Sequence, residues 1–170
     1  MQRVLGIDPG LRITGYSAMA LCDGALEPDL VEAGVIRLNG RDSIEQRLVQ
    51  LHQDLGKLIE DLTPTGVAVE MLYSHYRHPR TAILMAHARG VILLCARQRG
   101  LWVEHLASTE IKKAITGYGH ASKQQIQQAV ATQLHLEQPP KPPDVADAMA
   151  IALTQARRIA VRDSGGYIPP

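Results

Sequence analysis

The chain begins with three strand-like stretches in succession, and no helical pattern separates them. They are RVLGID (3–8), ITGYSAMAL (13–21) and LVEAGVIRL (30–38), and turn-rich segments join them. Consecutive strands with short connections usually pair side by side, so this region predicts an antiparallel meander. Any fold for this chain must be built around that sheet.

Helices and strands alternate after the meander. The most secure helix repeats apolar residues on one face from Ile44 to Leu62, and Ser43 with Gln46 forms a capping box at its start. The elements expected next are a strand (66–70), a helix (about 79–98), a strand (101–106) and three helices (108–115, 122–134 and 144–161). This order predicts an α/β fold, in which helices cover a mixed five-stranded sheet.

Size and composition favour one domain. The chain has 170 residues, of which 45% are hydrophobic, and this suits a single core. We expect the domain to span residues 1–162 and residues 163–170 to form a disordered tail. Cys22 and Cys95 lie far apart, so no disulfide framework is indicated. Because no charged and apolar leader and no membrane-length apolar run is seen, we expect a soluble cytoplasmic protein.

The net charge of +1 conceals an uneven distribution. Residues 1–70 hold 6 basic and 11 acidic residues, whereas residues 71–123 hold 8 basic and 2 acidic ones. Such asymmetry indicates a basic face for a polyanion beside an acidic region that can bind cations. A random distribution of surface charge is the alternative.

Four acids stand at positions that could bring them together. Asp8 and Glu70 each end an apolar strand-like run, so they could project from the same edge of neighbouring strands. Asp144 and Asp147 lie one helical turn apart at the start of the last helix. Each has a simpler explanation on its own, since Asp8 could stabilise a turn and Asp144 and Asp147 could cap the helix.

Packing the last helix on the sheet would collect the four carboxylates. At 4 Å and an effective dielectric constant near 20, each like-charged pair costs about 4 kcal/mol, so a cation must offset the repulsion. Ligands that are all oxygen suit Mg²⁺ or Mn²⁺, and two such ions can catalyse in-line phosphodiester hydrolysis.

Five motifs, in this order and spacing, resemble the RuvC Holliday junction resolvases of the RNase H-like superfamily. They are GIDPGLRITGY, AVE followed by Tyr73, AHARGV, IKKAITGYGHASKQQI and DVADAMAIAL, and the resemblance covers about residues 2–157. The resemblance implies an RNase H-like fold and a metal-dependent endonuclease that cuts four-way DNA junctions by paired symmetric nicks. It also implies two Mg²⁺ ions per site, with Mn²⁺ as a substitute, a homodimer, and the RuvA and RuvB branch-migration proteins as partners.

Residue roles follow from the same resemblance. It implies that the catalytic metal ligands are Asp8, Glu70, Asp144 and Asp147, that Lys112 and Lys123 are basic site residues, and that Tyr73 stacks on junction bases. The chain departs from the family at four positions. Tyr73 stands where Phe is typical and His87 where Gln is usual, and Tyr118 and His120 occupy variable positions. These departures affect junction fit and sequence preference.

Other basic residues can be weighed from the sequence alone. Lys123 follows Ser122, which with Gln125 forms a second capping box, and a cation there opposes the helix dipole unless a phosphate binds. Arg77 and Arg80 are candidate phosphate contacts, or simply solvated surface. The stretch HYRH (75–78) could suggest zinc, but no second ligand pair accompanies it.

Two rival functions remain open, a YqgF-type RNase H-like nuclease acting on RNA and a junction-binding protein without catalysis. The start DPGLRITG also resembles the phosphate loop of sugar kinases and actin-like ATPases, but that fold needs a second lobe that 170 residues cannot supply. Assembly is a separate question, because residues 81–96 are too apolar for a helix with one solvated face. The sequence therefore predicts a homodimer, the alternative being a helix wholly buried within its own monomer.

Overall fold

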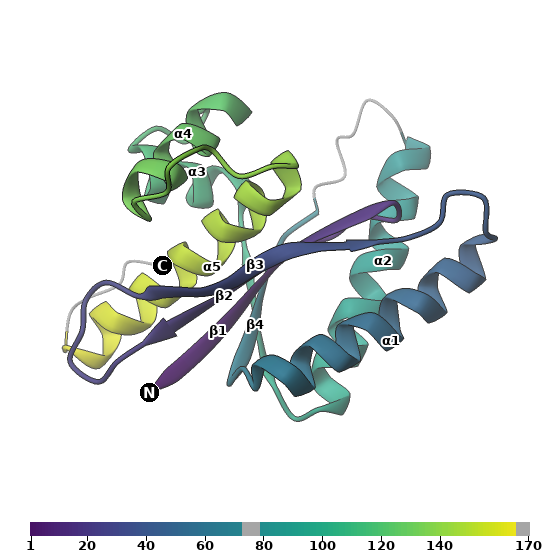
Figure 1. Cartoon of the computed structure of the whole chain (residues 1–170), viewed down its shortest axis with the longest axis horizontal. Helices are drawn as coiled ribbons and strands as arrows, with labels where there is room; N and C mark the ends of the chain where they lie inside the picture. Colours follow the sequence, from purple (N-terminus) through teal and green to yellow (C-terminus); the bar gives the residue numbers. More distant parts are fainter. Residues whose placement is uncertain (73–78, 166–170) are drawn as a thin grey trace.

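The computed structural model describes residues 1–72 and 79–165 and consists of one sheet with helices on both faces (Figure 1). The five strands lie in the order β3-β2-β1-β4-β5. Their bounds are β1 Gln2–Asp8, β2 Ile13–Leu21, β3 Asp29–Arg37, β4 Gly66–Glu70 and β5 Trp102–Leu106. The first three strands pair antiparallel, and β4 and β5 run parallel to β1. The predicted meander and mixed sheet are confirmed.

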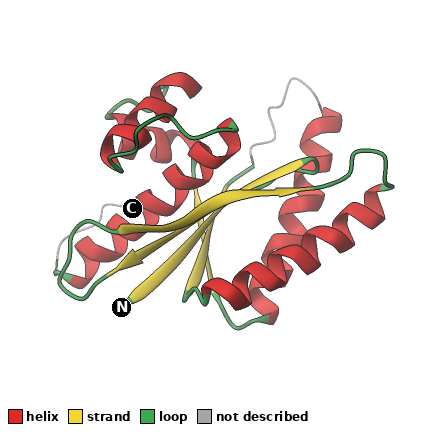
Figure 2. Ribbon diagram, viewed as in Figure 1, coloured by secondary structure: helices red, strands yellow, loops and turns green. Residues whose placement is uncertain are grey.

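Helices cover the two faces in separate groups (Figure 2). Helices α1 (Ile44–Leu62) and α2 (Pro79–Gln98) pack together, and α3 (Ser108–Thr116), α4 (Lys123–Gln133) and α5 (Pro143–Asp163) form the other group. An apolar core lies on each face of the sheet, and β1 contributes side chains to both. Val4 packs with residues of α5, whereas Leu5 and Ile7 pack with residues of α1 and α2. This alternation follows from the strand period of two and explains why β1 is almost entirely apolar.

Both polar capping boxes predicted from the sequence are present. Ser43 accepts a hydrogen bond from the Gln46 amide at the start of α1, and Ser122 does the same for Gln125 at α4. The capping role considered for Asp144 is wrong. Pro142 is the N-cap of α5 and makes no side-chain cap hydrogen bond. Proline suits the first helical position because it has no N–H to satisfy, so the helix begins at Pro143 and Asp144 lies inside its first turn.

Two glycines allow α5 to lie directly on the sheet. A Cβ atom at Gly15 of β2 would stand 2.0 Å from the Asp144 carbonyl oxygen, and one at Gly6 of β1 would stand 2.5 Å from the Ala152 nitrogen. No larger residue fits at either position without movement of the helix backbone. The start of α5 is therefore held close to the carboxyl end of β1.

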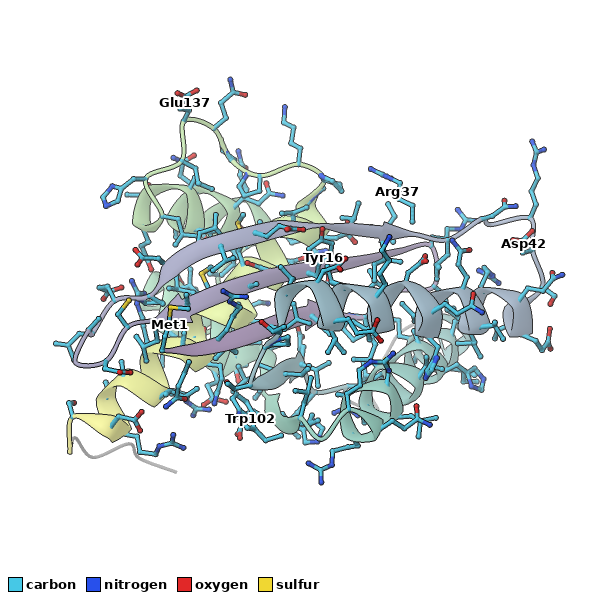
Figure 3. The ribbon with its side chains drawn as sticks, turned by 60° about the horizontal axis from the view of Figure 1, so that its bottom comes forward. Met1, Tyr16, Arg37, Asp42, Trp102 and Glu137 are labelled. Carbon is cyan, nitrogen blue, oxygen red and sulfur yellow. The ribbon has the colours of Figure 1, made fainter. Side chains whose placement is uncertain are left out.

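Two aromatic side chains are packed on the sheet. Tyr16 lies against Gly34 and donates a hydrogen bond to Glu32, and Trp102 lies against Gly66 (Figure 3). Both side chains are half-buried. Their rings fill the space that a glycine on the neighbouring strand leaves open.

Helix α2 keeps an apolar surface. Ile83 and Leu94 are 57% and 54% exposed, and their spacing of three turns places them on one side of the helix. The alternative of a helix wholly buried within its own monomer is therefore wrong. Cys95 of the same helix is buried and carries a free thiol. Within residues 1–72 and 79–165, no helix is long and apolar enough to cross a membrane.

Candidate active site

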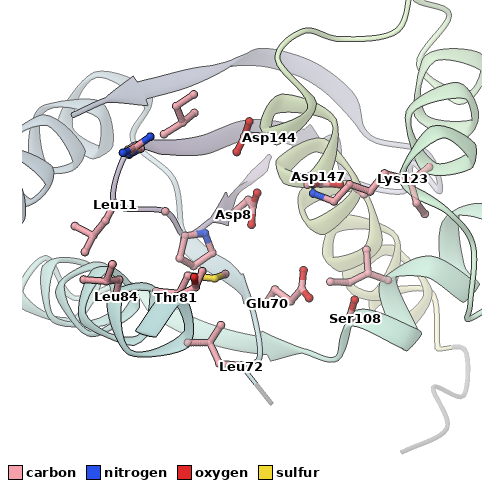
Figure 4. Close-up of a pocket in the computed structure, with 18 of the residues that line it drawn as sticks. Asp8, Leu11, Glu70, Leu72, Thr81, Leu84, Ser108, Lys123, Asp144 and Asp147 are labelled. Atoms are coloured by element: carbon pink, nitrogen blue, oxygen red, sulfur yellow. Dashed lines mark ion pairs between the residues drawn. The ribbon is translucent and has the colours of Figure 1, made fainter. Parts of the chain in front are cut away.

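A pocket of about 690 Å³ opens where β1 and β4 end (Figure 4). Asp8 is the last residue of β1, and Glu70 is the last residue of β4. Because these strands are parallel neighbours, with Ile7 paired to Val69, both acids leave the sheet at the same edge. The prediction that they share an edge is confirmed.

Helix α5 brings the other two acids to this pocket. Asp144 and Asp147 both line it, and Figure 4 shows the four carboxylates around one space, with Asp8 between Glu70 and the helix. The close seat of α5 on Gly15 determines this approach, because that glycine contacts the backbone of Asp144 itself. The four acids predicted from the sequence therefore line one pocket.

Burial and mutual repulsion make the charged carboxylates unfavourable. Burial is the main cause that raises the pKa of Asp8 from 3.8 to about 8, and the other three acids add to this rise. Burial also raises the pKa of Glu70, although a hydrogen bond from the Ser108 side chain opposes it. The pKa of Asp147 is raised by burial and lowered in part by Lys123. The pocket is therefore poised to accept positive charge.

The donor chemistry fits a hard divalent cation, since the acidic groups offer oxygen ligands and need a positive charge to offset them. As the side chains stand in the described ranges, no group of three or more acidic, histidine or cysteine residues is arranged to hold a metal ion. Without a cation the four carboxylates repel one another and stay apart. To bind a metal ion, their side chains would need to turn towards it.

Two lysines face the acids. Lys112 of α3 and Lys123 of α4 both line the pocket. The Nζ atom of Lys123 lies 3.6 Å from an Oδ atom of Asp147, although its side chain remains 80% exposed. Asp147 thus offsets the unfavourable position of this cation at the start of α4. The neighbouring Lys113 is exposed and is not among the residues that line the pocket.

The sequence interpretation missed Arg89 and Ser108. The Nε–H group of Arg89 donates to the Glu70 carbonyl oxygen at 3.1 Å, and its Nη2 atom lies 2.6 Å from Nδ1 of His105. Arg89 thereby ties α2 and β5 to the residue that ends β4. Its place within the AHARGV motif was the available signal. Ser108 is the first residue of α3, two positions after the end of β5, and only that position in the sequence indicated a role in the site.

Arg12 and Arg47 were also missed, and both line the pocket. Arg47 donates from Nη1 to the Leu11 carbonyl oxygen at 2.9 Å, which fixes the turn after Asp8. Arg12 is exposed on that turn. The basic residues around the acids therefore include two from the acidic first part of the chain.

Some predicted contacts cannot be placed. Tyr73 and Arg77 lie outside the described residues, as does the HYRH stretch. Arg80 belongs to the first turn of α2, but its side chain is outside the described part.

Comparison with known proteins gives a consistent result. Residues 4–155 match the family model for "Crossover junction endodeoxyribonuclease RuvC". Proteins of that name from Rhodopirellula baltica and Gloeobacter violaceus are 48% and 41% identical to the chain. The first alignment covers 88% of the chain and 83% of the relative, and the second covers 89% and 86%.

Solved structures show the same similarity. The Thermus thermophilus RuvC structure in complex with Holliday junction substrate superposes with a TM-score of 0.85 at 31% identity, and covers 96% of this chain and 98% of its own. The yeast mitochondrial Holliday junction resolvase Ydc2 has a TM-score of 0.65 at 16% identity, covering 95% and 82%, and supports the fold alone.

Proposed function

The chain belongs to the RuvC family of crossover junction endodeoxyribonucleases, and from this premise we propose how its own residues cut a four-way DNA junction. It is a Holliday junction resolvase of RNase H-like fold. The observation that supports the site assignment is the meeting of acids from β1, β4 and α5 in one pocket. Three separate elements would not converge on four carboxylates for structural reasons, because their repulsion destabilises the fold.

We propose that the metal ligands are Asp8, Glu70, Asp144 and Asp147. Two Mg²⁺ ions, with Mn²⁺ as a substitute, suit these oxygen donors. When bound, such ions make water a stronger nucleophile and offset the charge of the phosphate. Ser108 and Arg89 hold Glu70 in place, through its carboxylate and its backbone carbonyl respectively.

Lys112 and Lys123 bind the phosphate that approaches the acids. Without such contacts the carboxylates would repel the DNA backbone. Lys123 also lies at the N-terminus of α4, where backbone N–H groups favour an anion. Its mostly exposed ammonium can leave Asp147 for a phosphate at little energetic cost. We also propose that Tyr73 stacks on junction bases and that Arg77 and Arg80 contact phosphates.

The decisive experiment uses Mg²⁺ with synthetic four-way junction, duplex and RNA hybrid substrates side by side. We expect paired nicks in the junction only. Asp8→Asn and Glu70→Gln should abolish cutting and retain junction binding, because phosphate contacts provide most of the affinity. Glu104→Gln is the matched control, since this acid lies on neighbouring β5 but does not line the pocket.

The outcomes separate the rival functions. Cleavage of the RNA hybrid alone would favour the YqgF-type alternative, and junction binding without cleavage would favour a binding protein. Either acid variant cutting near the wild-type rate would overturn the metal-ligand assignment.

We further propose a homodimer, in which the exposed apolar side of α2 around Ile83 and Leu94 meets its copy. A two-fold dimer matches the symmetry of a four-way junction. Sedimentation at micromolar concentration tests this, and a monomer with and without junction would contradict it. We propose that the RuvA and RuvB branch-migration proteins are its partners. We also propose that it acts in the cytoplasm, where bacterial DNA lies.

A further inference from the structure

Tyr118 differs from the other large aromatic residues that the structure describes. Tyr16 and Trp102 are half-buried, and each packs against a glycine of a neighbouring strand. Tyr118 is 59% exposed on the loop between α3 and α4. Packing therefore explains the first two rings, whereas Tyr118 is largely exposed to solvent.

The ring of His120 stands beside that of Tyr118. Their centroids are 5.7 Å apart and their planes meet at 68°, which is an edge-to-face pair. In this arrangement the edge of one ring meets the face of the other, so each ring keeps at least one face uncovered by its partner. The pair thus fixes the ring orientation and leaves an aromatic face available.

The loop itself is firmly held. The Thr116 hydroxyl accepts a hydrogen bond from the Tyr118 amide at 3.1 Å and donates to the Lys112 carbonyl at 2.8 Å. The amide of the buried Ala121 donates to the Tyr118 carbonyl at 3.2 Å. Gly117 begins the loop with φ of 76°, a conformation that glycine adopts without strain. The ring is therefore presented by a preorganised backbone.

This loop packs beside the pocket that holds the acids. A Cβ atom at Gly119, between the two aromatic residues, would lie 3.3 Å from the Thr109 carbonyl oxygen. Thr109 follows Ser108, which lines the pocket and hydrogen-bonds to Glu70. The loop that carries the aromatic pair therefore packs on the first turn of α3, which begins at the pocket-lining Ser108.

The charge around the pair suits a phosphodiester strand. Residues 111–136 contain three lysines and no acidic residue. Lys112 precedes the loop, Lys123 follows it, and both line the pocket. Proteins that bind single-stranded nucleic acids combine basic side chains with exposed aromatic rings, and this loop carries an exposed ring between two lysines in the sequence.

We propose that Tyr118, supported by His120, stacks on a nucleobase of the strand whose phosphate lies between Lys112 and Lys123. This inference rests on the proposed function and adds a base-binding subsite to it. Base faces are covered inside a continuous duplex, so the subsite acts on nucleotides unstacked near the crossover. It also makes Tyr118 a determinant of cleavage position, because bases differ in how readily they unstack.

The test places 2-aminopurine at successive positions around the cut site of a junction, with Ca²⁺ in place of Mg²⁺. Stacking quenches this fluorescent base, so wild type and Tyr118→Phe should quench a position that Tyr118→Ala leaves bright, while any position stacked by Tyr73 should stay quenched in all three proteins. A stacked base is worth about 1–3 kcal/mol, so junction affinity should fall about 5- to 160-fold in the alanine variant. The nicks of the alanine variant should spread over more positions, because Tyr118 helps to determine where the junction is cut, and His120→Ala should lose part of the quenching.

Tyr118→Leu keeps apolar bulk without an aromatic face and serves if the alanine variant unfolds. Folded Tyr118→Ala or Tyr118→Leu that quenches the same position and binds as tightly as wild type would overturn the subsite. Nicking of junctions by the wild-type protein in Mg²⁺ tests the proposed function separately. If the wild-type protein nicks junctions but the Tyr118 variants quench 2-aminopurine as wild type does, the subsite is rejected and the proposed function stands.

Discussion

Replacing Asp8 by asparagine should stabilise the metal-free protein, although it removes a proposed catalytic group. Asp8 is half-buried and faces Glu70, Asp144 and Asp147, with Lys123 as the opposing charge, and its pKa is raised to about 8. A carboxyl whose pKa is higher in the folded state loses stability as the pH rises above its unfolded value, which is 3.8. Asparagine has the same shape and cannot ionise.

The size of this effect follows from the pKa shift. Each unit corresponds to about 1.4 kcal/mol, so the wild type should lose up to about 4 kcal/mol relative to Asp8→Asn between about pH 4 and pH 7. The three neighbouring acids share the repulsion, which makes this figure an upper limit. Above the folded pKa the difference should stop growing.

Urea denaturation in EDTA at several pH values measures the difference. The two proteins should have similar free energies of unfolding near pH 4 and diverge towards pH 7, and Mg²⁺ should narrow the gap by stabilising the wild type. Asp54→Asn, an exposed acid on α1, is the control and should follow the wild type. An Asp8→Asn protein that is less stable than wild type at pH 7, by an amount independent of pH, would refute the reasoning.

Three further predictions concern the surroundings of the acids. Lys112→Ala should weaken junction binding and reduce the salt dependence of the binding constant by about one unit of log–log slope, whereas Lys113→Ala, outside the pocket, should alter both less in the same titration. Arg89→Gln removes the contact to the Glu70 carbonyl, so it should slow single-turnover cleavage about tenfold and raise the Mg²⁺ concentration required for cleavage. Junction affinity should stay the same, and an unchanged Mg²⁺ dependence would argue against this positioning role. Gly15→Ala should destabilise the fold by about 1–3 kcal/mol in thermal unfolding, because its Cβ meets the Asp144 carbonyl, while Gly90→Ala, with open space around it, should be neutral or stabilising.

Sequence patterns predicted most of the fold because local and tertiary preferences agree. The continuous apolar run of β1, the polar capping boxes at Ser43 and Ser122, and the apolar face of α1 each favour the element that forms. The start of α5 was less predictable. Asp144 is a good capping residue by type, but the preceding prolines allow the helix to begin earlier.

The acids of the site were predictable because each ends a strand or begins a helix. Arg89 was not, since its role depends on where α2 passes the end of β4, and no local pattern encodes that distance. Arg12 and Arg47 belong to a region whose net charge is negative, so a count along the chain could not reveal that they line the pocket.

The close packing of α5 on Gly6 and Gly15 also determines when, during synthesis of the chain, the four acids can come together. Synthesis proceeds from the N-terminus, so a nascent chain carries Asp8 and Glu70 long before Asp144 and Asp147 are made. Until α5 emerges and docks, the face of the sheet beneath it is uncovered and the pocket has only the acids that the sheet supplies. On the proposed assignment, the ribosome-bound chain holds only two of the four metal ligands, and we expect cutting to begin only after α5 has packed on the sheet.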